Sequence, residues 1–141
     1  MEQSPKPKKA DALVYGESVS VTFVETQTVK DGVECDVYKI NGDETMDLAV
    51  VRVQPKHATP LQLVKSGVRT TEIFSAGSGT LKVTGLDGVT VEHVFSADSE
   101  PCAIDVNVGD SMQWTAGSEE VLEFQEVCIP PYEDGRFENL D

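Results

Sequence analysis

Hydrophobic and polar residues alternate along most of the chain. The alternation is clearest in six short segments, residues 18–23, 49–53, 81–83, 89–93, 104–108 and 122–125. Successive side chains of a strand point to opposite faces of a sheet, so this pattern predicts half-buried β-strands. Turn-forming pairs separate the segments, namely Asp31-Gly32, Asn41-Gly42, Asp87-Gly88, Gly109-Asp110 and Ala116-Gly117. The sequence therefore predicts an all-β fold of about ten short antiparallel strands, as in a sandwich, barrel or jelly roll.

The chain length fits one domain. A chain of 141 residues can bury a core without disulfides or structural metals. Residues 1–12, MEQSPKPKKADA, combine lysines with prolines, and we expect a flexible basic tail there. We expect a single β-barrel domain over residues 13–141. Its last part, residues 129–141, is predicted to wrap the barrel as a strap anchored by Tyr132 and Phe137.

Charge and cysteine content narrow the possible partners and location. The formal net charge is −14, from 25 acidic and 11 basic residues, so phosphate backbones and anionic membranes are repelled. The three cysteines, Cys35, Cys102 and Cys128, form no CxxC pair, which argues against a zinc knuckle and fits a reducing compartment. We find no signal-peptide pattern and no apolar run near membrane-spanning length. We therefore expect a cytoplasmic protein that binds neither nucleic acid nor membrane.

Two stretches of the chain resemble the paired motifs of the cupin superfamily. The first is PKHATPLQLV at residues 55–64, followed by TTEIFSAGSG at residues 70–79. The second is VNVGDSMQWTAGSE at residues 106–119, and LEFQEVCIPPY at 122–132 resembles the closing strand of small cupins. The resemblance covers about residues 47–138. It implies a small single-domain cupin with a jelly-roll barrel.

The same resemblance bears on metal binding. Many cupins hold a metal with an HxH pair, a glutamate and a third histidine. Here the histidine positions correspond to Gln62, Val64 and Met112, and the glutamate position falls at Thr70 or Glu72. Valine offers no lone pair and methionine only a weak thioether, so these residues would hold a metal poorly. We therefore expect no metal and no cofactor.

Glu72 and His57 are the candidate catalytic residues. Burial of Glu72 in an apolar pocket would raise its pKa and suit it to acid–base work, whereas an ion pair with Arg69 would lower the pKa. His57 is either a general base at the barrel mouth or an ordinary loop histidine. His93, on an alternating segment, carries a similar pair of interpretations.

Five further residues are candidates for substrate binding. They are expected to face the barrel interior, where Trp114 would either stack on a ligand or fill the core. These residues are Gln62, Val64, Phe74, Met112 and Trp114.

The leading functional hypothesis is a metal-independent cupin that binds an organic small molecule in its barrel. If it is an enzyme, we expect acid–base isomerisation, cyclisation or dehydration. One alternative is a non-catalytic ligand-binding or structural cupin, and another is a metal-dependent enzyme with an atypical site. We also expect a homodimer, because pairing hides exposed sheet edges.

Overall fold

The computed structural model describes residues 9–14, 17–100 and 102–140, so residues 1–8 of the predicted tail lie outside the described residues. The described backbone contains twelve strands and no helix. The strands are β1 (Lys9–Val14), β2 (Glu17–Lys30), β3 (Val33–Ile40), β4 (Asp47–Val53), β5 (Gln62–Val64), β6 (Arg69–Ala76), β7 (Gly79–Thr84), β8 (Thr90–Phe95), β9 (Ala103–Asn107), β10 (Ser111–Ala116), β11 (Leu122–Ile129) and β12 (Phe137–Asn139).

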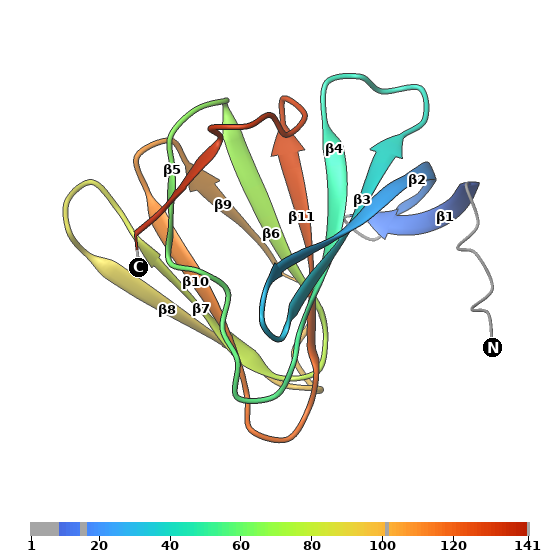
Figure 1. Ribbon diagram of the computed structural model, residues 1–141. Coiled ribbons are helices and arrows are strands. Elements are labelled where there is room, and N and C mark those ends of the chain that lie inside the picture. Colours follow the sequence, from blue (N-terminus) through green and yellow to red (C-terminus); the bar gives the residue numbers. More distant parts are fainter. Residues whose placement is uncertain (1–8, 15–16, 101, 141) are drawn as a thin grey trace.

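These strands form two antiparallel sheets, which confirms the all-β jelly-roll prediction. The larger sheet has seven strands in the order β1-β2-β3-β4-β11-β6-β9. The smaller sheet has five, in the order β12-β5-β10-β7-β8. Figure 1 shows the two sheets side by side, with the C-terminal segment passing from the end of β11 to the smaller sheet. The described residues include no helix with the length and apolar character needed to span a bilayer.

The six alternating segments coincide with the strands β2, β4, β7, β8, β9 and β11, except that Val89 lies just before β8 and Val108 just after β9. In β11, for example, Leu122 and Phe124 are buried while Glu123 and Gln125 keep part of their surface exposed. The strand β1 is a difference from the prediction, because it includes residues 9–12, which we assigned to the flexible tail. Backbone pairing of β1 with β2, in the register Lys9 to Thr22, requires no apolar alternation, and this explains why the pattern did not reveal it.

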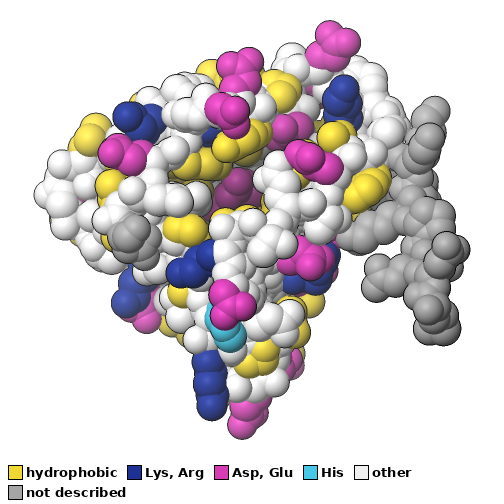
Figure 2. Space-filling model, in the orientation of Figure 1, with side chains coloured by type: hydrophobic (Ala, Val, Ile, Leu, Met, Phe, Trp, Pro, Cys, Tyr) yellow, Lys and Arg dark blue, Asp and Glu magenta, His cyan; other side chains and the backbone are white. Residues whose placement is uncertain are grey.

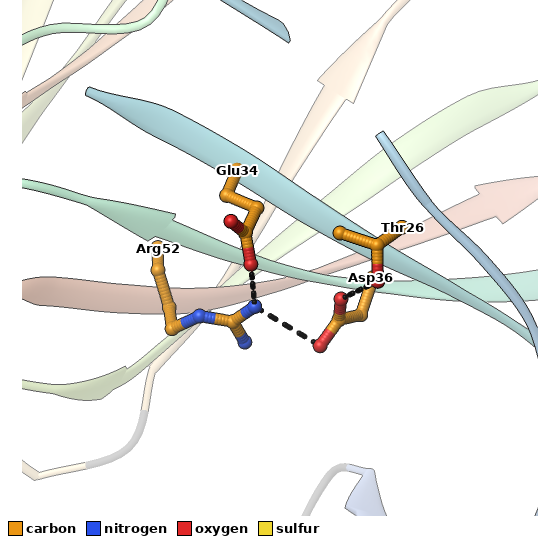
Figure 3. A network of polar contacts seen from close by, with 4 residues as sticks. All are labelled: Thr26, Glu34, Asp36 and Arg52. Carbon is orange, nitrogen blue, oxygen red and sulfur yellow. Dashed lines mark hydrogen bonds and ion pairs between the residues drawn. The ribbon is translucent and has the colours of Figure 1, made fainter. Parts of the chain in front are cut away.

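A polar network on the larger sheet fixes the register of β2, β3 and β4 (Figure 3). Arg52 Nη2 donates to Glu34 at 2.8 Å and to Asp36 at 3.0 Å, and the Thr26 hydroxyl donates to Asp36 at 2.6 Å. Arg52 stands directly opposite Glu34, and Thr26 directly opposite Asp36. Such cross-strand pairs stabilise one register of a sheet over its alternatives. They thereby determine which β3 and β4 side chains face the other sheet.

Stacked aromatic rings fill the centre of the space between the sheets. Phe74 stacks on Phe95 at 4.9 Å between ring centroids, Phe95 on Trp114 at 5.7 Å, and Trp114 on Phe124 at 4.3 Å. All four rings belong to the main apolar core. The middle of the barrel is therefore packed with the protein's own side chains.

Residues 130–136 form the part of the predicted 129–141 strap that joins β11 to β12, and the name strap is used for these residues from here on. Arg136 is buried, and its guanidinium donates to the backbone carbonyls of Pro130, Ile129 and Arg69. Beyond the strap, β12 pairs with β5 and so ties the chain end to the smaller sheet. The rings of Tyr132 and Phe137 stack with centroids 5.9 Å apart, which places both predicted anchors together.

Candidate functional site

A cavity of about 650 Å³ lies between β3, β4 and β11 of the larger sheet and β5 and β12 of the smaller one. Strap residues Pro131 and Tyr132 also line it. Its walls include the apolar side chains Val33, Val37, Ala49, Val51, Phe124 and Phe137. Figure 2 shows a hollow on this face of the molecule with apolar and acidic side chains around it. The cavity is displaced from the aromatic centre of the barrel toward the strap.

The carboxyl group of Glu126 lies in the wall of this cavity. Alternation along β11 places Glu126 on the same inward face as Leu122 and Phe124. On the neighbouring strand β6, Glu72 stands directly opposite Glu126. Side chains opposite each other on adjacent strands are close neighbours, and two like charges there are destabilising.

Glu72 is completely buried behind Glu126. The indole Nε1–H of Trp114 donates to Glu72 Oε1 at 2.8 Å, while Oε2 is buried without a donor among the described residues. Burial raises the pKa of Glu72 well above its ordinary value, and the neighbouring charge of Glu126 raises it further. The Trp114 hydrogen bond lowers the pKa and offsets only part of this rise.

One proton shared by the two carboxyls resolves this arrangement. A protonated Glu72 would donate to Glu126, and this bond would satisfy the oxygen of Glu72 that otherwise lacks a partner. Burial raises the pKa of Glu126 as well, but the hydrogen bond from Glu72 favours its charged form. The hydrogen bond between the two carboxyls thus favours the proton on Glu72 and the charge on Glu126, the member that lines the cavity.

Asp47 and Cys128 lie beside the carboxyl pair, where β4 and β11 meet the strap. They stand opposite each other in the sheet, and both line the cavity. Asp47 accepts a hydrogen bond from the backbone N–H of Tyr132 at 2.9 Å, and burial raises its pKa. The Cys128 thiol lies 3.9 Å from Glu126 Oε1, and burial raises its pKa far enough to keep it protonated. Cys128 is therefore a donor to Glu126 and not a nucleophile.

The structure brings only part of the predicted binding set to the cavity. Gln62 lines it, and its side-chain amide donates to Asn139 at 3.2 Å. Four other predicted binding residues are buried in the main core and are absent from the cavity lining: Val64, Phe74, Met112 and Trp114. These four side chains pack with one another in the core instead of lining this cavity.

The two predicted catalytic residues, Glu72 and His57, differ in where they lie relative to the cavity. Glu72 stands opposite Glu126, which lines the cavity. Arg69 forms a long ion pair with Asp105, at 3.8 Å, so the close charged neighbour of Glu72 is Glu126. His57 lies outside the cavity lining. Its ring packs against Gly32, and Nδ1 lies 2.9 Å from the backbone carbonyl of Pro55.

The residues at the expected metal positions do not fit a metal. Met112 pairs with Gln62 across β10 and β5, so the aligned positions do come together. However, Val64 and Met112 are embedded in apolar core side chains and supply neither nitrogen nor oxygen. Within the described ranges, no group of three or more histidine, cysteine, aspartate or glutamate side chains is arranged to hold a metal ion.

Glu126 and Asp47 are the site residues that sequence reasoning missed. The pairing of Glu126 with Glu72 depends on the contact of β11 with β6, which local patterns do not reveal. One signal was available: after Leu122 and Phe124, the next inward position of the same alternating segment is a glutamate. A carboxyl group at a core-facing position is uncommon and indicates a functional candidate.

Comparisons with known proteins relate this chain to others by structure alone. No known protein-family model and no curated protein sequence matches it. The capsular polysaccharide assembling protein CapF from Staphylococcus aureus is similar with a TM-score of 0.64 and 12% identity, over 86% of this chain and 34% of that one. Bacillus subtilis oxalate decarboxylase is similar with a TM-score of 0.66 and 16% identity, over 79% of this chain and 29% of that one. The Lactobacillus farciminis oxalate decarboxylase is similar with a TM-score of 0.65 and 15% identity, over 85% of this chain and 33% of that one.

This chain thus spans about a third of the length of these solved structures. At such low identity the similarity establishes the fold and nothing about activity. CapF and oxalate decarboxylase are cupin-fold proteins, so the cupin-type fold expected from the two motif stretches is confirmed.

Proposed function

We propose that this cupin-fold protein binds an organic small molecule in the cavity beneath the strap and acts on it without a metal, through Glu126. The observation that carries the proposal is a buried carboxyl pair, one member of which forms part of the cavity wall. Ligand sites are typically concave, mostly apolar and equipped with a few polar groups. A cavity of about 650 Å³ is in the usual size range for such sites.

The chemistry that suits this pair is proton transfer. The Glu126 carboxylate, which faces the ligand, can remove a proton from carbon and return it at a second position, which isomerises the substrate without any oxidant. In a dehydration, the proton that Glu126 removes from one carbon would pass to the hydroxyl on the neighbouring carbon, which leaves as water while the C=C bond forms. In a cyclisation, Glu126 would take the proton of a hydroxyl that adds to a C=C bond and return it to the neighbouring carbon. Glu72 acts through Glu126 as a positioning residue, and Trp114 orients Glu72 through its 2.8 Å hydrogen bond.

A binding screen tests the first half of the proposal. Trp114 is the only tryptophan and stacks on Phe124, which lines the cavity, so its fluorescence should respond to ligands. We expect a screen of small organic compounds to give hits that change this fluorescence and raise the melting temperature. The variant Ala49→Phe, which fills part of the cavity, should abolish the hits while remaining folded. Hits that persist unchanged in this variant, or a screen without hits, would contradict the proposal.

Variants of the carboxyl pair test the second half. With a substrate found among the hits, Glu126→Gln should abolish turnover even at substrate concentrations that saturate the variant. Glu72→Gln should lower turnover and shift the pH profile, because it removes the group that holds the shared proton. Full activity of Glu126→Gln would exclude Glu126 as the acid–base residue. Near one equivalent of transition metal in protein purified without added metal would contradict the metal-independent part.

A second candidate is a binding protein without catalytic activity. The observation that favours it is that neither histidine lies among the described residues lining the cavity. Under this alternative the screen yields ligands that are released unchanged. Mass spectrometry of each ligand after prolonged incubation separates the two candidates.

A further inference from the structure

The cavity contains an excess of acidic side chains, and this excess bears on the class of its ligand. Five carboxylic acids line it, together with the single lysine Lys39. The acids are Glu25, Asp43, Glu44, Asp47 and Glu126. Figure 2 shows acidic side chains around the hollow. Clefts lined by one sign of charge concentrate ligands of the opposite sign. This lining favours a negative potential in the cavity, in keeping with the net charge of −14.

The inner carboxyl groups, Asp47 and Glu126, have no cation of their own. Among the described residues, the acids that form ion pairs with lysine or arginine are Glu34, Asp36, Glu92, Asp105 and Glu138. The guanidinium of Arg136 lies near enough to lower the pKa of both carboxyl groups by its charge. Its Nη1 and Nη2 groups donate to backbone carbonyls instead. Asp47 and Glu126 are therefore left as acceptors for a ligand.

The buried pair adds an independent reason to expect a donor in the ligand. Glu72 Oε2 is completely buried and lacks a donor unless it shares a proton with Glu126. Such sharing favours the negative charge on Glu126, which lines the cavity beside its apolar walls. A carboxylate in such surroundings is stabilised most by a donor that carries positive charge, because charge-assisted hydrogen bonds are about twice as strong as neutral ones.

On the basis of the proposed function, we propose that the ligand is an organic amine in its protonated form. Its ammonium group donates to Glu126, with Asp47 close by, and its hydrocarbon body packs against the apolar walls. Carboxylate and phosphate ligands are disfavoured by the same negative charges.

Three matched probes test this assignment: 2-phenylethylamine, 2-phenylethanol and phenylacetate, titrated calorimetrically at pH 7 and equal ionic strength. We expect the amine to bind at least about tenfold more tightly than the alcohol, a factor that corresponds to ~1.4 kcal/mol, and phenylacetate to bind most weakly. Glu126→Gln should reduce the affinity for the amine to that for the alcohol. Asp47→Asn, a second variant that keeps an acceptor for the strap, should weaken amine binding in the same direction.

The control is Glu119→Gln, which removes one charge from an exposed position outside the cavity. It should leave all affinities unchanged. Equal binding of phenylacetate and the amine, or equal losses in Glu126→Gln and Glu119→Gln, would overturn the amine assignment. In those cases binding of the alcohol would show that the cavity is still a ligand site. Failure of all three probes to bind would overturn the proposed function together with this inference.

Discussion

At the scale of single residues, the pairing of Glu72 with Glu126 is the central feature of the molecule. Two carboxyls opposite each other in a buried sheet cannot both be ionised without a large cost. The indole of Trp114 and the thiol of Cys128 each offer one donor to the pair. The result is a carboxyl group at Glu72 whose pKa is raised well above its ordinary value, beside a second carboxyl group, Glu126, that lines the cavity.

The protonated state of Glu72 predicts the pH dependence of stability. Its pKa is raised in the folded protein from an ordinary value of 4.5. The folded state therefore binds more protons than the unfolded chain between pH 4.5 and the raised pKa of Glu72, and stability falls as the pH rises through this window. One retained proton corresponds to about 1.4 kcal/mol per pH unit.

Urea unfolding at several pH values checks this dependence. Glu72→Gln resembles the protonated acid, so this variant should lose much less stability toward pH 8 than the wild type. Identical pH slopes for the two proteins would show that Glu72 does not hold the proton.

The Trp114 hydrogen bond predicts a specific loss of stability. Trp114→Phe removes the indole N–H that donates to Glu72 Oε1 and leaves a buried acceptor without this donor. We expect a cost of about 1–3 kcal/mol beyond the loss of packing. A double-mutant cycle with Glu72→Met isolates this contribution, since Trp114→Phe should cost less once the acceptor is gone. Additive effects would contradict a direct interaction.

At the scale of elements, the sequence predicted strands well and their partners poorly. Period-two alternation identified β2, β4, β7, β8, β9 and β11, because successive residues of a half-buried strand point alternately to the core and to solvent. It missed β3, where Asp36 is buried by its contacts with Arg52 and Thr26 and breaks the simple pattern. The Glu72–Glu126 pair depends on strand neighbours 54 positions apart, which no local pattern contains.

The strap is the element that closes the cavity, and Arg136 holds it. The guanidinium donates to three backbone carbonyls and is 2% exposed. Arg136→Lys keeps the charge but cannot reach three carbonyls at once. We expect amide hydrogens of the strap to exchange at least about tenfold faster in this variant, while β4 and β6 stay protected. Uniform acceleration across the molecule would indicate global destabilisation, and no acceleration would mean that Arg136 does not hold the strap.

At the scale of the whole molecule, the cupin motifs indicated the correct fold, whereas the cavity that we propose as the ligand site lies apart from most of the motif positions. The motif positions Val64 and Met112 are filled by core packing, and the open volume lies toward β3, β4 and the strap. The predicted homodimer, the cytoplasmic location and the exclusion of nucleic acid and membranes stay predictions. Sedimentation equilibrium would test the dimer directly.

The most direct test of the account is a crystal structure of the protein soaked with the strongest ligand from the screen. The account predicts density beneath Tyr132 and Phe137, with a polar group of the ligand within hydrogen-bond distance of Glu126. Density for the ligand or for a metal at Gln62, Val64 and Met112, with the cavity beside Glu126 empty, would contradict it.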